Sequence, residues 1–357
     1  HANGQEITIE TGKLAKQAHG SVVVRQGNTM IMATVVSDYK AGENVDFLPL
    51  TVDYRERFAS TGRFPGGFLK REMRPSDYEI LISRLIDRAC RPLFPDDYHA
   101  NTMLMVTLIS GDDQVMPDTL ACLASSCAIM VSDIPFNGPI SEVRVAKING
   151  EYKVNPSVSE LVGASLELIV AANANDILMV EGEGDEVSET EMLEALRIAH
   201  DAIKLQCKAL NELTVACGKT EKRVYSHETH DEELRAELWK NYYEKYLAVA
   251  KLANPKKDER KAGFKAIVDE FIASLPEDHT VNIGLAKHYL HDIEKEAARQ
   301  LVLQERYRLD GRKLNEIRQI TCEVDYLPTP HGSSVFTRGE TQSLTTVTLG
   351  TKMDEQI

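Results

Sequence analysis

The first part of the chain is dominated by short stretches in which apolar and polar positions alternate. This alternation over 6–36 and 45–54 predicts β-strands, because successive side chains of a strand point to opposite faces. Further strands are expected at short apolar runs bounded by turn residues, at 102–109, 143–148, 152–154, 166–172 and 176–181. Helices are expected where apolar residues recur three and four positions apart, at 76–91, 117–131 and 188–217. Together these elements predict an α+β core over residues 1–218.

The pattern changes after this core. Residues 219–230 are mostly polar and predict a linker. Apolar residues then recur at helical spacing with no strand pattern between them, which predicts helices over 231–253, 255–275 and 282–307. Residues 219–303 are therefore expected to form a linker and a small all-helical domain.

A segment near the end of the sequence repeats a segment near its start. When 19–36 is laid on 331–348 without a gap, eight of the 18 positions carry the same residue. Unrelated strands would share about one or two such positions, so the repeat predicts a duplicated domain. The first copy needs residues 1–218, whereas the second starts at about 304 and the sequence stops at 357. We therefore interpret 304–357 as the truncated beginning of a second core.

Composition narrows the class of protein. The 357 residues are 43% hydrophobic and 27% charged, as in globular proteins of more than one domain. No apolar run approaches the roughly 20 residues of a membrane span, so no membrane association is expected. The six cysteines are scattered and form no CxxC motif, which is typical of free thiols in a reducing cytoplasm.

The charge of one short window opposes the charge of the whole chain. The chain has 41 Lys and Arg against 55 Asp and Glu, a net charge of −14. Residues 55–91 hold nine basic and five acidic residues, a local excess of four positive charges. Such a local reversal indicates contact with an anion in a molecule that otherwise repels anions.

This window contains a loop and then a helix. Pro65, Gly66 and Gly67 predict the loop, and an aromatic side chain beside two cations follows, in Phe68-Leu69-Lys70-Arg71-Glu72. The pattern suits single-stranded nucleic acid, because a ring can stack on a base while cations hold phosphates. The alternative is a solvated loop before an ordinary amphipathic helix. The apolar face of that helix would be Ile80, Leu81, Ile82 and Leu85. Its arginines, Arg84, Arg88 and Arg91, would pair with Asp77, Glu79 or Asp87.

The run 64–95 resembles the first core of bacterial polynucleotide phosphorylases (polyribonucleotide nucleotidyltransferases). It is similar to their Phe-Phe-Arg-Arg-Glu loop and Arg-Leu-Ile-Asp-Arg helix, and the resemblance continues in 133–139, 308–318 and 336–342. Two positions depart from the family pattern. Leu69 stands where a second Phe is usual, and Lys70 replaces an Arg, which keeps the charge but loses the planar fork of the guanidinium group.

The resemblance implies two ribonuclease PH-like cores, with a ribosomal protein S5 domain 2-like β-α fold, joined by a helical domain. It implies a cytoplasmic homotrimer that degrades RNA from the 3′ end by phosphorolysis during mRNA turnover, beside other RNA-degradation proteins. Inorganic phosphate would be the co-substrate and magnesium the metal ion. In this family the bacterial first core has lost catalysis. The phosphate-binding loop and the metal-binding aspartates belong to the second core, so this chain is expected to hold no catalytic or metal-binding residue and to be inactive alone.

The resemblance also assigns binding residues. Phe68, Leu69, Lys70 and Arg71 would line the narrow opening of a trimeric ring and grip single-stranded RNA, and Arg74 would assist them. Arg338 could contact an anion in the complete second core; an ion pair with Glu340 or another carboxylate is the alternative.

Other chemistry-bearing groups are weaker candidates. The carboxylate pairs Asp96-Asp97 and Asp112-Asp113 lie beside Gly or Pro and are interpreted as solvated turns. Two histidine pairs, His227 with His230 and His288 with His291, lack a third ligand at a recognisable spacing. Two rival functions remain open at this point. One is a non-catalytic RNA-binding or scaffold protein, and the other is a single-core ribonuclease PH relative, which the helical insert and the repeat disfavour.

Overall fold

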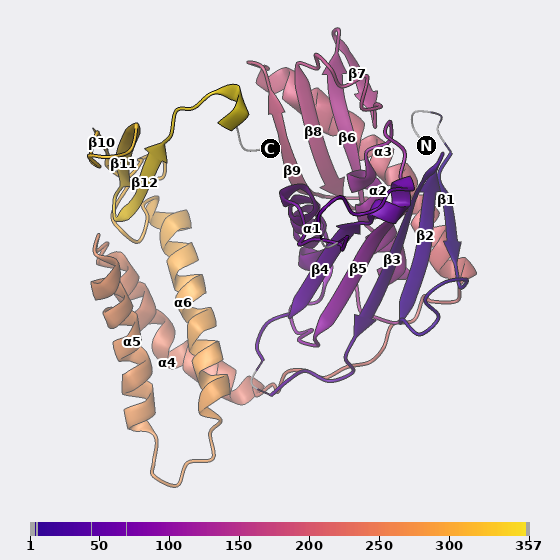
Figure 1. Cartoon of the computed structure of the whole chain (residues 1–357). Helices are drawn as coiled ribbons and strands as arrows, with labels where there is room; N and C mark the ends of the chain where they lie inside the picture. Colours follow the sequence, from indigo (N-terminus) through magenta and orange to yellow (C-terminus); the bar gives the residue numbers. More distant parts are fainter. Residues whose placement is uncertain (1–3, 5, 44, 69, 355–357) are drawn as a thin grey trace. The chain divides into compact units, whose positions relative to one another are not determined.

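The structure is a computed structural model that describes residues 4, 6–43, 45–68 and 70–354. It divides the chain into two compact units, His1–Glu228 and Thr229–Ile357, which are described separately (Figure 1). The first unit holds two sheets and three helices, and the second holds three helices and one small sheet. This mixture of sheets and helices confirms the predicted α+β fold.

The first sheet of the first unit has five strands in the order β1-β2-β3-β5-β4. Its strands are β1 (Thr8–Thr11), β2 (Gly20–Gln26), β3 (Thr29–Ser37), β5 (Thr102–Ser110) and β4 (Leu50–Glu56). Neighbouring strands are antiparallel except for β4 and β5, which are parallel. Along β3, every second side chain is buried, as the alternating sequence pattern predicts.

Two helices pack on the buried face of this sheet. The helix α2 (Pro117–Met130) contacts β2 and β3, and α1 (Asp77–Cys90) contacts β4. Every residue of α2 after Pro117 is buried, which explains why its sequence holds small and apolar residues and almost no charge. Because α1 follows the loop singled out in the sequence, its position on β4 fixes where that loop leaves the sheet.

The second sheet is antiparallel, in the order β7-β6-β8-β9. Its strands are β7 (Glu151–Val154), β6 (Ser141–Ile148), β8 (Leu166–Ala172) and β9 (Ile177–Gly184). The long helix α3 (Glu189–Ala216) packs against β6, β7 and β8. It begins with a reciprocal capping box in which Ser188 accepts from the Glu191 backbone and Glu191 accepts from the Ser188 backbone.

The apolar face predicted for α1 is partly wrong. The helix starts with a capping box at Ser76, and it buries Ile82, Ile86, Ala89 and Cys90. Ile80 and Leu81 are instead 44% and 54% exposed. At about 100° per residue, these two positions turn away from the face that contains Ile82 and Ile86.

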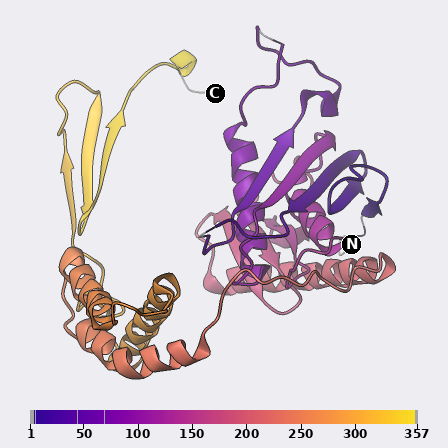
Figure 2. The same cartoon turned by 90° about the horizontal axis from the view of Figure 1, so that it is seen from below.

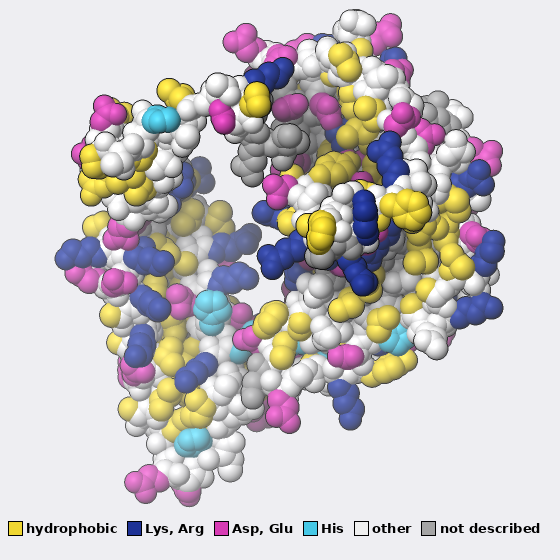
Figure 3. All heavy atoms as spheres, in the orientation of Figure 1, with side chains coloured by type: hydrophobic (Ala, Val, Ile, Leu, Met, Phe, Trp, Pro, Cys, Tyr) yellow, Lys and Arg dark blue, Asp and Glu magenta, His cyan; other side chains and the backbone are white. Residues whose placement is uncertain are grey.

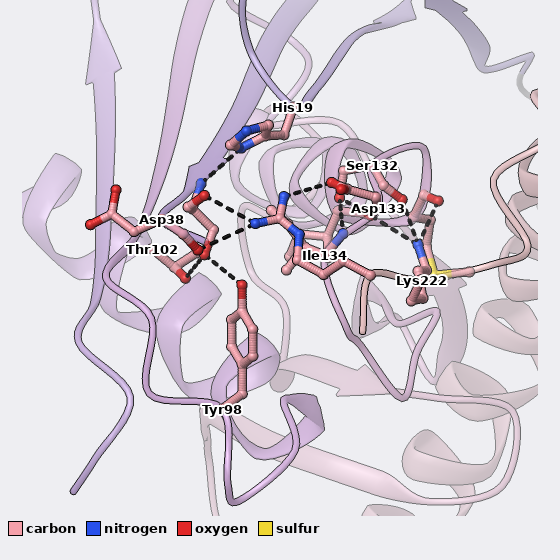
Figure 4. Close-up of polar contacts among 12 residues, drawn as sticks. His19, Asp38, Tyr98, Thr102, Ser132, Asp133, Ile134 and Lys222 are labelled. Atoms are coloured by element: carbon pink, nitrogen blue, oxygen red, sulfur yellow. Dashed lines mark hydrogen bonds and ion pairs between the residues drawn. The ribbon is translucent and has the colours of Figure 1, made fainter. Parts of the chain in front are cut away.

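The segment 219–228, predicted as a linker, has no helix or strand but is held firmly against the first unit (Figure 4). The Nζ atom of Lys222 donates to three backbone oxygens at the C-terminal end of α2, those of Ile129, Met130 and Ser132, at 3.4, 3.0 and 2.8 Å. Arg223 donates to the Asp133 carboxylate at 2.6 Å and stacks on the Tyr39 ring. These contacts explain why the compact unit extends to residue 228.

The second unit starts with three helices, α4 (Glu232–Lys251), α5 (Lys257–Ser274) and α6 (Ile283–Glu305). Their core is built from residues three and four apart, including Leu238, Tyr242 and Tyr246 of α4. This agrees with the helical periodicity of the sequence. No helix in the described ranges has the length and apolar character needed to cross a lipid bilayer.

A three-stranded antiparallel sheet follows, with β10 (Ile320–Val324), β11 (Gly332–Arg338) and β12 (Thr341–Val347). The hairpin β11–β12 repeats the hairpin β2–β3 at an offset of 312 residues. Gly20 pairs with Val35 in the first hairpin, and Gly332 pairs with Val347 in the second. The same offset relates the two hairpin turns, since Gly27 and Gly339 both have positive φ angles.

A histidine contact is duplicated as well. His19 Nδ1 accepts a hydrogen bond from the backbone N–H of Ser37 at 3.0 Å, and His331 Nδ1 accepts one from Leu349 at 2.9 Å. The two hairpins thus share their strand register, the conformation of their turns and a histidine contact. These similarities agree with a second ribonuclease PH-like core that begins at the second hairpin.

Candidate nucleic-acid interface

The loop of the basic window connects β4 to α1. After β4 ends at Glu56, one short turn of 3₁₀ helix covers Phe58–Thr61, and Gly62 stops it with a φ of 70°. The chain then runs without regular structure until the capping box at Ser76 starts α1. Figure 2 shows this segment projecting away from the sheet. Its two ends are fixed by packed elements while its tip reaches into solvent.

The tip exposes large apolar side chains. Phe68 is 99% exposed, Phe64 is 90% exposed and Met73 is 70% exposed. Fully solvated aromatic rings contribute nothing to the folded core, and an exposed apolar group in a basic setting is typical of a binding surface. In Figure 3, hydrophobic and basic side chains gather together over this segment.

The cations of the tip are available to a ligand. Lys70 and Arg71 are exposed, and neither forms an ion pair with any described residue. Lys70 has a φ of 50°, and its backbone N–H donates to the Gly67 oxygen at 3.0 Å, which closes a tight turn. Leu69, the other residue predicted here, lies outside the described residues.

Other arginines of the basic window are already neutralised. This holds for three of them: Arg55 pairs with Asp53, Arg88 with Glu181 and Arg91 with Asp87. Arg84 forms no ion pair with a described residue. The alternative interpretation from the sequence, arginines paired with nearby carboxylates, therefore holds for Arg91 of the helix. Arg88 pairs with β9 of the other sheet, a partner that sequence spacing could not indicate.

A hollow of about 440 Å³ lies at the root of the loop. Arg57, Arg63 and Arg74 line it, all three are exposed, and the described part of the chain offers no ion pair to any of them. Sequence reasoning had singled out Arg74 alone. The convergence of Arg57 and Arg63 depends on the 3₁₀ turn between them, and their spacing of six residues carries no periodic signal.

The three carboxylates that line the hollow are engaged with its wall. Glu72 accepts from the Phe58 backbone N–H at 3.3 Å, and Glu79 accepts from the backbone of Glu56 at 2.8 Å. Burial opposes ionisation of Glu79, but the hydrogen bonds that it accepts from the Glu56 backbone and from Ser76 lower its pKa. Burial raises the pKa of Glu56, which accepts from the Tyr54 hydroxyl. The arginines therefore face the hollow without direct carboxylate partners.

A smaller hollow of about 120 Å³, lined by Asp118 and Arg144, is a poorer anion site. The buried Arg144 side chain forms ion pairs with both Asp118 and Glu167. Two carboxylates around one guanidinium group leave no net positive charge for an incoming anion.

The weaker candidates from the sequence are held in local contacts. Asp112 accepts from the Gln114 backbone at 2.9 Å, as expected of a turn. Asp97 accepts a hydrogen bond from the Tyr225 hydroxyl, and His227 accepts one from the backbone N–H of His99. Both contacts hold the segment 219–228 against residues 97–99 of the first unit. Each histidine of the α6 pair lies 3.9 Å from an acidic residue on its own helix, His288 from Asp292 and His291 from Glu294.

No group of three or more His, Cys, Asp or Glu side chains that could hold a metal ion occurs within the described residues. The described residues therefore offer no cluster of ligands for the magnesium ion that the resemblance implies. Arg338 lies in the second unit, exposed at the end of β11, and the described residues give it no ion pair with Glu340.

Comparison with known families explains this arrangement. Residues 3–135 and 316–357 match the profile of the 3′ exoribonuclease family, domain 1, and residues 138–202 match domain 2 of the same family. The chain belongs to the 3′ exoribonuclease family. The double match to domain 1 falls on the two copies of the duplicated hairpin. Residues 233–313, which hold the three helices of the second unit, match a profile described as "Polyribonucleotide nucleotidyltransferase, RNA binding domain".

Curated relatives of this family are similar over nearly the whole chain. Polyribonucleotide nucleotidyltransferases of Cytophaga hutchinsonii and Bacteroides fragilis are 60% and 58% identical, and that of Porphyromonas gingivalis is 55% identical. Each similarity covers 99% of this chain but only 48–50% of the relative. The chain thus spans about half the length of these relatives. The resemblance to polynucleotide phosphorylases that 64–95 indicated is confirmed.

Proposed function

We propose that this chain is the RNA-gripping part of a polyribonucleotide nucleotidyltransferase. In the whole enzyme, an oxygen of inorganic phosphate attacks the last phosphodiester at the 3′ end of an RNA. The bond from that phosphorus to the preceding 3′ oxygen breaks, which releases a nucleoside diphosphate and leaves a shorter RNA with a 3′ hydroxyl. A magnesium ion would neutralise charge on the attacked phosphate, with ligands outside this chain. The relatives, which are polyribonucleotide nucleotidyltransferases, support this assignment.

The observation that carries the proposal is the exposed tip of the β4–α1 loop. Phe68 offers an almost fully exposed ring, and Lys70 and Arg71 offer charge beside it that no described residue pairs. Stacking of one base on an aromatic ring contributes about 1–3 kcal/mol without sequence preference. A loop with this chemistry fits an enzyme that must hold RNA of any sequence as it is shortened. Arg338 would contact an anion in the complete second core.

Assembly explains how an acidic chain handles RNA. We infer a homotrimer in which three copies of the loop meet on one axis and form a cationic collar. Each loop alone is small, but three loops at one opening raise the local positive potential that an RNA strand meets. The homotrimer would act in the cytoplasm, where it would take part in mRNA turnover beside other RNA-degradation proteins.

The catalytic machinery belongs to the second core. We assign residues 1–218 to the first core, 219–303 to the linker and helical domain, and 304–357 to the start of the second core. We infer that this chain alone is catalytically silent, because the resemblance places the phosphate-binding loop and the metal-binding aspartates in the second core.

The test is a phosphorolysis assay. The chain is incubated with oligoadenylate, inorganic phosphate and magnesium, and nucleoside diphosphate is measured by chromatography. We expect no release, while fluorescence anisotropy of the same sample reports binding of the oligoadenylate. A full-length relative, such as the Bacteroides fragilis enzyme, is the positive control. Release at the rate of the full-length relative would refute our placement of the active site, and a lack of binding would refute the role of the loop.

A further inference from the structure

We propose that the hollow lined by Arg57, Arg63 and Arg74 binds a backbone phosphate of the same RNA strand whose bases stack at the loop tip. The inference rests on the proposed function, because it extends the path of that strand from the tip to the root of the loop. It assigns binding roles to Arg57 and Arg63, which neither the loop motif nor the family profiles single out.

The first argument is the availability of charge. Three guanidinium groups face one hollow, and none of them forms an ion pair within the described ranges. Like charges that lie close together without a direct ion-pair partner repel one another, and a phosphate that enters between them relieves this repulsion. By contrast, the paired Arg55 at the edge of the same hollow has Asp53 at 2.9 Å.

The second argument is the orientation of the carboxylates. Glu72 and Glu79, which would otherwise neutralise the arginines, accept hydrogen bonds from the backbone of Phe58, Glu56 and Ser76. These bonds hold the acidic groups to the wall of the hollow and fix the loop at its root. The acidic residues therefore shape the site while its arginines remain free to bind an anion.

The third argument is continuity with the loop tip. Glu72 and Met73 line the hollow and follow Arg71 directly in the chain, and Arg74 completes the same turn. A strand whose base stacks on Phe68 can therefore place a neighbouring phosphate in the hollow. Arginine suits this role because its planar fork can donate two parallel hydrogen bonds to one phosphate.

The experiment compares three double variants of the full chain by the salt dependence of oligoadenylate binding. Arg57→Gln with Arg63→Gln removes two guanidinium groups from the hollow. Lys70→Ala with Arg71→Ala tests the tip. Arg25→Gln with Arg197→Gln is a control matched in charge: it removes two positive charges from exposed positions elsewhere on the first unit, where Arg197 forms ion pairs with Glu194 and Asp201.

For the hollow variant we expect weaker binding and a shallower slope of the logarithm of the binding constant against the logarithm of the salt concentration. The slope should fall by about 0.7 for each phosphate of a single strand that the variant no longer neutralises. The control should match the parent chain. A further variant, Arg57→Lys with Arg63→Lys, should restore the slope but not the full affinity, because lysine keeps the charge and loses the fork. Thermal melting verifies that each variant is folded, as expected for substitutions of exposed side chains.

Two results would overturn the proposals, and they are distinguishable. If the tip variant loses RNA while the hollow variant binds with the parent affinity and slope, the hollow is not on the RNA path and only this inference fails. If both variants bind as the parent does, the role proposed for the loop fails as well.

Discussion

Arg57, Arg63 and Arg74 are chemically identical to Arg55 and Arg91, but their surroundings give them different roles. An exposed ion pair such as that of Arg91 with Asp87 contributes about 0–1 kcal/mol to stability, and it leaves less of the arginine's charge available to a ligand. The unpaired arginines keep their hydrogen-bond donors free. At the scale of the residue, local pairing therefore decides which part of the basic window can meet RNA.

Glu142, unlike the exposed arginines, is an ionisable residue that the fold buries and so holds in its neutral form. It is 1% exposed, and only the weakly donating thiol of Cys122 interacts with its carboxyl oxygens among the described residues. The other ionisable groups that face it are Asp118 of α2, Arg144 of β6 and Cys90 of α1. Burial first, and then the charge of Asp118, raise the pKa of Glu142 well above its usual value.

This raised pKa predicts a pH-dependent stability. The unfolded chain loses the Glu142 proton above pH 4.5, whereas the folded chain keeps it, so the folded state loses stability as the pH rises. Glu142→Gln cannot titrate. The free energy of unfolding of the variant, measured by urea titration from about pH 5 to about pH 8, should gain on the parent by up to about 1.4 kcal/mol per pH unit. A parent-minus-variant difference that does not change with pH would contradict the suppressed charge.

At the scale of elements, the sequence pattern predicted the helix and strand features that depend on neighbouring residues. The helix expected over 188–217 begins at the capping box of Ser188 and Glu191, because the hydrogen bonds of such a box depend on neighbouring residues alone. The segment 219–228 was different. Its polar residues indicated a linker, but Lys222 and Arg223 bond to the end of α2 and to residues far away in sequence. No periodic pattern records such a tertiary contact.

The contact of Lys222 with α2 can be tested through its titration. Burial lowers the pKa of Lys222 to about 8, although the charge of Asp133 opposes this shift. Between pH 8 and the ordinary lysine value of 10.5, the unfolded chain holds a proton that the folded chain has released, so stability attributable to Lys222 rises with pH. The free energy of unfolding of the parent should therefore gain on that of Lys222→Gln across this window. If the variant gains on the parent instead, Lys222 is not buried against α2.

At the scale of the whole molecule, the duplication was readable from the sequence because it left identical residues at a fixed offset. The structure adds that the two hairpins share register and histidine contact. The residues proposed to contact RNA differ in how far the sequence indicated them. The tip residues Phe68, Lys70 and Arg71 formed a recognisable motif, whereas Arg57 and Arg63 join it only through the folded path of the loop. Sequence order alone does not reveal which side chains line one hollow.

The central claim is that RNA contacts this chain at the β4–α1 loop. The most direct measurement is photo-crosslinking of the chain to a single-stranded RNA that contains 4-thiouridine, followed by mass spectrometry of the digested protein. We predict crosslinked peptides from residues 57–74, with Phe68 among the modified positions. Crosslinks confined to other segments, with none in 57–74, would contradict the claim.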